Sequence, residues 1–547
     1  MSDYRDKIYS DAWRAFKDPE VPEYFNPTVV VLDRNIADGR GDKTALIVDD
    51  QPYSYSDLLG HVCRASNGLQ SLNIEPGSRM LMFGTDSLEY SATWFGAIRA
   101  GIVPAVISDA YKAENLLYFL RDTACKTLFI DSEQQEKLND IAEDIPHTLK
   151  TVIVRGDLSG APESGDRQTL SHAEMVEGHS ETAEAYPLHN NDITYMFYSG
   201  GTTGTAKGIT HLAHDFYLVP ERHGAFLEYR ESDIVHATSK KYFTHGLWPG
   251  LLIPLYFGAT SVISRLPPTP ENVVNLVEAT KPTKMITVPT IIKNIMLFAD
   301  QERVPDFSSL EVVTSASEKM PPEVFERFHE LFELEILDSI GSSEITYEWI
   351  ANRPKDFRRG SLGKPVFGFE AKLMDADGNE VTEPNTDGEA WIKSSTTCFF
   401  YWRKLDKTKE TFVGEWARTG DTLMYDEDGF FWFSGRSDDV FKVKGLWVSP
   451  IEVEAAITED DAVLEAAVVS YEDDDGLTKP KAFVVLNPGE EASDALADRL
   501  KAGVRRIGGY KVPEEIDFVE ALPRTTLMKI DRRALRVQEA EARGKPV

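Results

Sequence analysis

Little in this sequence points to disulfides, metal sites or secretion. The 547-residue chain has only three cysteines, Cys63, Cys125 and Cys398, and no two of them have the spacing of a metal-binding pair. An odd number of widely separated cysteines is typical of a reducing compartment, where thiols stay free. The residues that follow Met1 contain no apolar stretch of the kind a signal peptide needs. We therefore expect a cytoplasmic protein with reduced, buried thiols.

Basic residues and long apolar runs are also scarce. The chain has 58 lysines and arginines against 90 aspartates and glutamates, a formal net charge of −32 at pH 7. Nucleic acid and anionic membranes would repel such a surface, so we expect neither as a partner. Only residues 246–263 approach membrane-spanning length, and Pro249, Pro254 and three glycines interrupt them. Because proline breaks a helix, we predict a buried helix–turn–strand segment there.

The length and the pattern of apolar residues indicate an α/β protein of more than one domain. A chain of 547 residues exceeds one ordinary core. Strand-like runs alternate with amphipathic stretches, which favours parallel sheets flanked by helices. We predict strands over 79–83, 102–107, 127–131, 151–154, 192–197, 284–288 and 312–315, and helices over 56–71 with Ser56 as N-cap, 87–100, 112–122, 271–280 and 322–332. Residues 156–187 are polar and read as a surface excursion.

The pattern changes toward the carboxyl end. From residue 371 onward, short strands alternate with acidic turns at 375–378 and 426–429. These turns lack the full ligand spacing of calcium loops, so we interpret them as hairpin turns in a β-rich subdomain. The last hundred residues form a small separate unit, with helices predicted over 450–457 and 493–507 and strands over 464–471 and 482–486.

A glycine-rich loop follows the predicted strand 192–197. Residues 198–208 read YSGGTTGTAKG, with hydroxyls, glycines, one lysine and no acidic residue. Glycines let successive backbone amides point at an anion, threonines add short donors and Lys207 adds charge, so the composition suits phosphate. The spacing differs from that of the common P-loop. Taken alone, the stretch also fits an ordinary flexible connection.

Four later stretches allow a similar chemical interpretation. Residues 338–344 place hydroxyls, a glycine and Glu344 after a strand, which suits a nucleotide base and Mg²⁺ but also a helix-capping loop. Asp421 follows a predicted tight turn and suits a ribose diol. Residues 435–445 gather arginine, aspartates and lysines at the boundary of the small unit, and residues 522–532 are basic. Each of the last two can also be a charged surface segment.

In this order, the stretches resemble the motifs of the adenylate-forming superfamily, which comprises acyl- and aryl-CoA synthetases, peptide-synthetase adenylation domains and firefly-type luciferases. The resemblance covers nearly the whole chain, and five motifs in the right order are far more specific than any one of them. Within the superfamily the chain is most similar to benzoate–CoA and aminobenzoate–CoA ligases, over residues 26–27, 32–35, 242–247, 338–344, 359–365 and 447–452.

The resemblance implies a two-step reaction with ATP, Mg²⁺ and coenzyme A. A carboxylate attacks the α-phosphorus of ATP to give acyl-AMP and pyrophosphate, and coenzyme A then displaces AMP. Two anions must meet at phosphorus, so we expect catalysis by positive charge and oriented donors rather than by a protein nucleophile. The expected substrate is a small or aromatic carboxylate, benzoate-like and including polar or hydroxylated acids. We expect a monomer or a homodimer.

Two other functions compete with this one. The enzyme can instead load its acyl group onto a carrier-protein phosphopantetheine, although no carrier domain is attached. A non-catalytic nucleotide-binding regulator would lack the charge at Lys207, Glu344 or Lys529, and all three residues are present.

The resemblance also assigns site residues by their place in the motifs. It implies a fold with a large N-terminal domain of mixed and parallel sheets flanked by helices plus a β-rich subdomain, residues 1–435. A small mobile C-terminal α+β domain, residues 436–547, swings about a hinge at Asp438. Coenzyme A is assigned to Lys444 and Gly445, and the acyl group to Thr244, His245, Trp248, Gly341 and Tyr347. The catalytic residues are Thr202, Lys207, Glu344 and Lys529, of which Thr202 and Glu344 also bind the metal. The nucleotide is assigned to Ser199, Gly200, Gly201, Thr202, Thr203, Gly204, Lys207, Ser317, Glu318, Asp338, Ser339, Ile340, Ser343, Asp421, Arg436 and Lys529.

Several positions depart from the usual pattern. Met528 stands where a glycine often precedes the catalytic lysine, Ser317 replaces a glycine, and Ile340 replaces an aromatic ring found in many relatives. None of these changes removes a charge that the mechanism requires. Benzoate ligases tend to carry Tyr and His at the positions of His245 and Tyr347. His245 therefore either bonds a polar group of the substrate or packs against Trp248.

Overall fold

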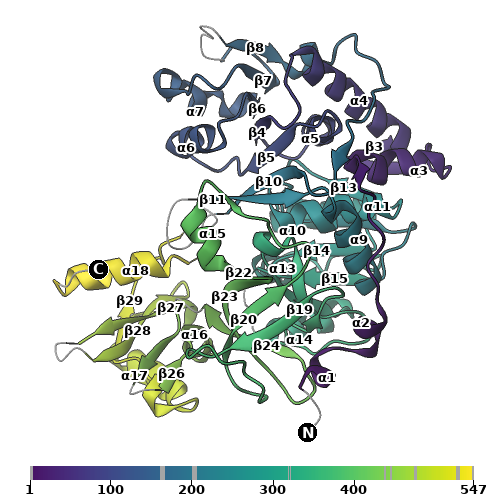
Figure 1. Cartoon of the computed structure of the whole chain (residues 1–547). Coiled ribbons are helices and arrows are strands. Elements are labelled where there is room, and N and C mark those ends of the chain that lie inside the picture. The colour runs from purple at the N-terminus through teal and green to yellow at the C-terminus, as the bar shows by residue number, and fades with distance from the viewer. Residues whose placement is uncertain are drawn as a thin grey trace.

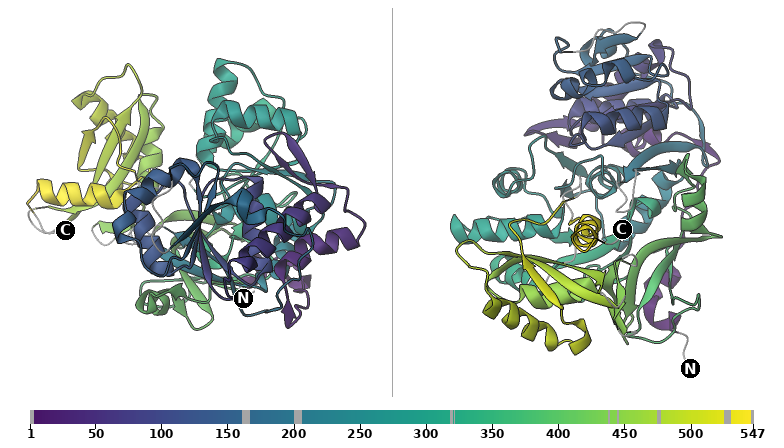
Figure 2. Two further views of the ribbon diagram at one scale, coloured as in Figure 1. Left: turned by 90° about the horizontal axis from the view of Figure 1, so that it is seen from above. Right: turned by 90° about the vertical axis from the view of Figure 1, so that its left-hand side faces the viewer.

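The structure, a computed structural model, describes residues 4–160, 167–199, 206–317, 320, 322–436, 439–443, 446–473, 477–524 and 530–544, with every side chain except that of Trp447. Within these ranges, sheets of eight, nine and five strands build the larger part of the molecule, and a smaller C-terminal unit stands beside it (Figures 1 and 2).

The eight-stranded sheet carries the ends of the glycine-rich loop. Its strands, in spatial order, are β21 (Tyr401–Trp402), β11 (Lys207–Leu212), β10 (Ile193–Ser199), β5 (Val103–Ile107), β4 (Arg79–Phe83), β6 (Thr127–Asp131), β7 (Thr151–Arg155) and β8 (Gln168–Ser171). Neighbours are parallel from β10 to β8, whereas β11 and β21 are antiparallel additions. In Figure 1, α4 (Tyr55–Ser71) and α5 (Leu88–Arg99) lie to one side of this sheet, and α6 (Ala113–Thr123) and α7 (Gln135–Asn139) to the other.

The nine-stranded sheet is parallel at its centre. Its order is β18 (Lys364–Pro365), β17 (Glu348–Ala351), β16 (Ile336–Gly341), β15 (Val312–Ser315), β14 (Lys284–Thr287), β12 (Ile234–Ala237), β13 (Thr260–Ile263), β2 (Thr44–Val48) and β3 (Gln51–Ser54). Helices α12 (Pro270–Thr280), α13 (Pro289–Gln301) and α14 (Pro322–Phe332) share one core. Helix α9 (Asp215–Phe226) and the turns α10 (Thr244–Leu247), η4 (Trp248–Leu252) and α11 (Ile253–Tyr256) lie between the two large sheets (Figure 1).

The main core lies where these two sheets face each other. Trp94 of α5 packs against Tyr195 and Phe216, and Phe216 packs against Trp248 at a ring distance of 5.4 Å. Trp94 and Trp248 are both almost completely buried. Because large aromatic side chains bury much apolar area, this cluster fixes the two sheets relative to each other. It also forms the base beneath the strands that carry the predicted site.

The third sheet and the C-terminal unit complete the fold. The third sheet contains β19 (Glu370–Met374), β20 (Gly388–Lys393), β22 (Phe412–Val413), β23 (Trp416–Tyr425) and β24 (Phe431–Arg436). The C-terminal unit contains β25 (Phe441–Val443), β26 (Leu446–Val448), α16 (Pro450–Thr458), β27 (Val463–Glu472), β28 (Thr478–Leu486), α17 (Asp494–Arg505), β29 (Glu515–Phe518) and α18 (Arg532–Ala542). Shorter elements are α1 (Arg5–Ile8), α2 (Asp11–Ala15), β1 (Tyr24–Phe25), η1 (Val29–Asp33), α3 (Arg34–Ala37), η2 (Ser132–Gln134), η3 (Ala142–Asp144), α8 (His172–Val176), β9 (Leu188–His189), η5 (Ser343–Ile345), α15 (Leu405–Thr411) and η6 (Gly509–Lys511).

Most of the predicted elements are confirmed. Residues 246–263 are almost wholly buried and run from helical turns into β13, as the prolines and glycines indicated. In the part of the chain that the structure describes, no helix is both long and apolar enough to cross a bilayer. All three cysteines are free and buried. The acidic stretch 426–429 is a hairpin turn between the antiparallel strands β23 and β24.

One local prediction was wrong, and another lacked detail. The N-cap of helix α4 is Ser54, two residues before the predicted Ser56, and Ser54 forms a reciprocal capping box with Asp57. The described part of residues 156–187 runs mostly over the surface, as predicted, and it includes β8, a parallel strand beside β7, and α8. Their sequence signal is weak because β8 is a short edge strand in which no residue is fully buried.

Candidate active site

The described residues on both sides of the glycine-rich loop are firmly placed. Ser199 ends β10 and pairs with Lys207, the first residue of β11, so the loop joins two adjacent antiparallel strands. The Tyr198 hydroxyl donates to Asp122 at 2.7 Å, and the Tyr118 hydroxyl donates to the Ala206 carbonyl at 2.6 Å. Gly200, Gly201, Thr202, Thr203 and Gly204 lie outside the described residues. The loop is thus held at both ends by buried or half-buried contacts.

Lys207, Tyr401 and Glu344 meet beside this loop. The Lys207 ammonium lies 4.4 Å from the centre of the Tyr401 ring and 3.4 Å from its hydroxyl. That hydroxyl donates to Glu344 Oε1 at 2.9 Å. Burial, together with the nearby carboxylate, raises the pKa of Tyr401 well above its ordinary value, so the hydroxyl remains a donor. The fold therefore brings together two predicted residues that are 137 positions apart in the sequence, through a third residue that the sequence had not suggested.

Tyr401 had no usable sequence signal. It lies in an aromatic run, residues 399–402, with no polar motif around it. Its position follows from the pairing of β21 with β11, which sets Tyr401 opposite Ile209. Such pairing at a sheet edge depends on tertiary structure.

Glu344 sits in the short turn η5, which several buried groups hold. His211 Nε2 lies 2.7 Å from the Ser343 carbonyl oxygen, and the Cys398 amide donates to the Glu344 carbonyl at 2.6 Å. The Thr244 and Ser343 hydroxyls lie 3.4 Å apart. The backbone of η5 is therefore bonded from β11 on one side and from the 394–400 loop on the other.

Strands β16 and β17 each contribute one buried acidic residue, Asp338 and Glu348. Ser339 Oγ lies 2.7 Å from Glu348 Oε1 and 3.0 Å from the Ser315 carbonyl oxygen. A serine hydroxyl has only one proton, so both bonds form when protonated Glu348 donates to Ser339 and Ser339 donates to Ser315. Burial raises the pKa of Glu348 to about 7 and also raises the pKa of Asp338 well above its usual value. The Ser339 side chain, predicted at the nucleotide, is thus bonded within the sheet.

Asp421 and Arg436 form an ion pair across β23 and β24, with Arg436 Nη1 donating to Asp421 Oδ1 at 2.7 Å. The prediction that Asp421 follows a tight turn was wrong, since it lies inside β23. The strand has an irregularity here, where Gly420 adopts a positive φ of 70°. A bulge with a left-handed glycine resembles a turn in sequence, because both need the same backbone freedom.

The residues predicted for the acyl group cluster around α10 and η4. Thr244, His245 and Trp248 are buried. His245 Nε2 lies within hydrogen-bonding distance of the Thr287 carbonyl, at 3.1 Å, and its ring lies 5.9 Å from that of Tyr347. A Cβ atom on Gly341 would approach the Tyr347 carbonyl to 2.4 Å, so only glycine fits there. Two roles were left open for His245, a bond to the substrate or packing against Trp248. The structure gives its ring a backbone partner and a packing contact with Tyr347.

Two family models match this chain. The AMP-binding enzyme model matches residues 33–402, and the AMP-binding enzyme C-terminal domain model matches residues 452–529. The chain belongs to the AMP-binding enzyme family. The resemblance drawn from the motifs is thereby confirmed at the level of the family, as is the α/β fold with its C-terminal domain.

Relatives of this AMP-binding enzyme include ligases of aromatic acids. It is 37% identical to the benzoate–CoA ligase of Thauera aromatica over 94% of this chain and 97% of that protein. It is 36% identical to the 4-hydroxybenzoate–CoA/benzoate–CoA ligase of Rhodopseudomonas palustris over 94% of each. The crystal structure of the anthranilate CoA ligase AuaEII with anthranoyl-AMP matches with a TM-score of 0.89 and 34% identity, over 97% of this chain and 100% of that one.

Several predicted residues of the AMP-binding enzyme lie outside the described ranges, namely Glu318, Asp438, Lys444, Gly445, Met528 and Lys529. Their described neighbours are informative. Arg524 and Ile530, on either side of Lys529, pair with each other in an antiparallel bridge. Ser317, which replaces the usual glycine, has a φ of 79°, so the position retains the left-handed backbone that favours glycine.

The Glu344 carboxylate is suited to Mg²⁺. Among the described residues, no group of three or more acidic, histidine or cysteine side chains is arranged to hold a metal by itself. Mg²⁺ commonly takes one or two carboxylates and receives its remaining oxygens from phosphate and water. Glu344 offers that single carboxylate, which accepts from the same Tyr401 hydroxyl that the Lys207 ammonium contacts.

Proposed function

We propose that this AMP-binding enzyme is an AMP-forming aromatic acid–CoA ligase. It adenylates a small or aromatic, benzoate-like carboxylate with ATP and then transfers the acyl group to coenzyme A. The observation that carries the proposal is the meeting of Lys207, Tyr401 and Glu344 at the end of the glycine-rich loop. The identity with aromatic acid–CoA ligases over nearly the whole chain supports it.

In the first step, the site must neutralise the phosphates and align the attacking carboxylate. Thr202, Thr203 and Lys207 belong to the loop over the β- and γ-phosphates, and Lys207 supplies a cation there. Lys529 bridges the substrate carboxylate and the α-phosphate. Glu344 and Thr202 hold Mg²⁺, which neutralises phosphate charge when bound. Asp421, which accepts from Arg436 at 2.7 Å, is assigned to the ribose hydroxyls, and Arg436 also reaches the nucleotide. These groups act through charge and position.

In the second step, the small domain, residues 436–547, rotates about Asp438 and brings the Lys444–Gly445 face to the site. The flanking contacts support a hinge at this position. Arg436 is bonded to Asp421 in the large part, whereas Asp439 accepts from Arg536 Nη1 of the small unit at 2.8 Å. Between residues 436 and 439, the chain therefore passes from side-chain contacts with the large part to side-chain contacts within the small unit. Hinges need only a few residues that absorb the backbone change.

The acyl pocket is assigned to Thr244, His245, Trp248, Gly341 and Tyr347, which suits a compact aromatic acid. Trp248 and Tyr347 are almost completely buried, so their rings offer a rigid apolar wall. His245 and Thr244 add polar atoms, which favours acids with a hydroxyl or amino substituent. Relatives named for benzoate, hydroxybenzoate and anthranilate support the same size class.

The test is carboxylate-dependent release of pyrophosphate from ATP and Mg²⁺. The panel comprises benzoate, hydroxybenzoates, aminobenzoates, and aliphatic acids from short to long chain, each with and without coenzyme A. We expect a benzoate-type acid to give the highest rate, with AMP and acyl-CoA formed together when coenzyme A is added. Reaction with long-chain fatty acids alone would contradict the substrate class. Acyl-AMP formation that ignores coenzyme A would favour a carrier-protein acceptor.

A further inference from the structure

One buried polar cluster next to the site has no role in the chemistry described so far. His211 lies on β11, four residues after Lys207, and Asp215 begins α9. His211 Nδ1 lies 3.1 Å from Asp215 Oδ2, and the Tyr195 hydroxyl donates to the same carboxylate oxygen at 3.0 Å. The His211 and Asp215 side chains are each only 1% exposed. Burying polar side chains at this depth is costly unless they are hydrogen-bonded, as both are here.

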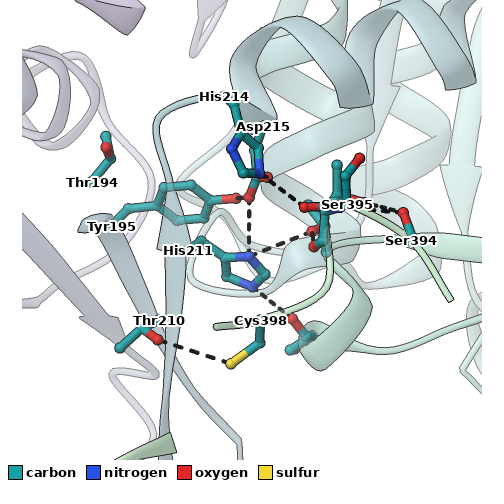
Figure 3. A network of polar contacts seen from close by, with 12 residues as sticks. Thr194, Tyr195, Thr210, His211, His214, Asp215, Ser394, Ser395 and Cys398 are labelled. Atoms are coloured by element: carbon teal, nitrogen blue, oxygen red, sulfur yellow. Dashed lines mark hydrogen bonds and ion pairs between the residues drawn. The ribbon is translucent and has the colours of Figure 1, made fainter. Parts of the chain in front are cut away.

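The orientation of the His211 ring is fixed from three directions. It stacks on the Tyr195 ring, with centroids 5.0 Å apart and planes 11° from parallel. Its Nδ1 faces Asp215, and its Nε2 faces the Ser343 carbonyl at 2.7 Å (Figure 3). Nδ1 also lies 3.4 Å from the Thr346 hydroxyl, whereas the Nε2 contact is made to the Ser343 carbonyl.

Ser343 is the residue immediately before Glu344, and both lie in η5. The short turn ends at Thr346, whose φ is 76°, a backbone conformation that a β-branched residue rarely adopts. Thr346 is buried and its hydroxyl donates to the Thr396 carbonyl. A strained turn keeps its shape only if its surroundings hold it. The bonds to Ser343, Glu344 and Thr346 are that support.

We propose that His211, held by Asp215, is a positioning residue for Glu344. Through the Ser343 carbonyl it fixes the turn that directs the Glu344 carboxylate toward the Mg²⁺ of bound ATP. The inference rests on the proposed function, because it takes Glu344 as the metal ligand. Groups that orient a ligand without touching the metal typically change metal affinity or activity by about 10- to 100-fold when they are removed.

The test separates a hydrogen bond to Ser343 from simple packing. An asparagine amide reaches about as far as Nδ1 of a histidine, whereas a glutamine amide reaches about as far as Nε2. His211→Asn therefore keeps a polar group toward Asp215 and loses the bond to Ser343. His211→Gln keeps that bond. Binding of ATP is measured by titration calorimetry, once with Mg²⁺ and once with EDTA, so that metal-dependent affinity is read without catalysis.

We expect His211→Asn to weaken binding of ATP with Mg²⁺ about tenfold and to change binding of metal-free ATP less than about twofold. His211→Gln should retain most of the metal-dependent affinity. Equal losses in the two variants, or equal losses with Mg²⁺ and with EDTA, would overturn the proposal. Asp215→Asn provides a second measurement if His211→Asn does not fold. It should also weaken the Mg²⁺-dependent binding, and unchanged binding would overturn the proposal.

His236 provides a matched control. It is also a buried strand histidine, and its Nδ1 bonds the Val262 carbonyl at 3.3 Å. His236→Gln should lower the melting temperature and leave Mg²⁺-dependent binding of ATP unchanged. A failure of the proposed function would look different, because the wild-type protein itself would then show no acid-dependent pyrophosphate release. A failure of the present inference leaves that release intact and the His211 variants indistinguishable from the control.

Discussion

The large part and the C-terminal unit handle charge in different ways. In the large part, site residues are tied to one another across distant segments, as in the set Lys207, Tyr401 and Glu344. In the C-terminal unit, the ion pairs of Lys481 and Arg532 are made within the unit itself, to Glu515, Asp517, Glu539, Glu454 and Asp439. The unit also has its own hydrophobic clusters. This difference suits a large part that is rigid around the site and a small domain that moves as one body.

The comparison predicts that one substitution in the C-terminal unit can affect one half-reaction and spare the other. Lys529→Ala should lower the rate of acyl-AMP formation about 1,000-fold, because a charge at the transferring phosphoryl group is lost. Thioester formation from supplied acyl-AMP should change little. The two half-reactions are measured separately, with Lys501→Ala of α17 as a control in the same unit. Equal loss of both half-reactions would contradict the assignment of Lys529 to the first step.

The buried carboxyl group of Glu348 in the large part predicts a pH effect on stability. Burial raises the pKa of Glu348 to about 7, above that in the unfolded chain. Between pH 4.5 and 7, the folded protein retains a proton that the unfolded chain has released, so stability falls as pH rises through this window. Glu348→Gln removes this titration. The free energy of unfolding of the variant, relative to that of the wild type, should therefore increase by about 3 kcal/mol from pH 5 to pH 8. Denaturant unfolding at both pH values measures it, and a constant difference would contradict the raised pKa.

The hinge can be tested by stiffening it. Asp438→Pro fixes φ and removes a backbone donor, so it should slow thioester formation about tenfold and adenylation much less. Asp438→Ala, which leaves the backbone free, serves as the matched control. Stopped-flow measurement of each half-reaction gives the two rates. If proline and alanine had the same effect, the boundary between the two parts would not be a hinge at this residue.

A smaller effect on stability is expected at Ser317, where the backbone is strained. Ser317 adopts a φ of 79°, and a residue other than glycine in this region costs about 1 kcal/mol or more. Ser317→Gly should therefore stabilise the protein by up to about 1 kcal/mol, less the greater freedom that glycine gives the unfolded chain. Thermal unfolding measures the change. A destabilised variant would show that the Ser317 side chain makes a contact worth more than the strain.

Local patterns sufficed for much of the fold and for the list of site segments. The buried segment 246–263, the strands 79–83 and 127–131 and the hairpin at 426–429 all follow from apolar runs, prolines and turn residues that are close in sequence. The family resemblance follows from the order of motifs along the chain, which needs no contact map. These features depend on neighbours within a few residues, where spacing and propensity already decide the conformation.

Tertiary structure alone decided how the site is held together. Tyr401 reaches Lys207 and Glu344 only because β21 adds to the edge of the eight-stranded sheet. The bond from His211 to Ser343 joins residues 132 positions apart. Glu348 has a raised pKa because the folded sheet excludes water from it. Sheet-edge pairing, long-range hydrogen bonds and desolvation depend on which distant surfaces meet, and the local sequence does not specify that.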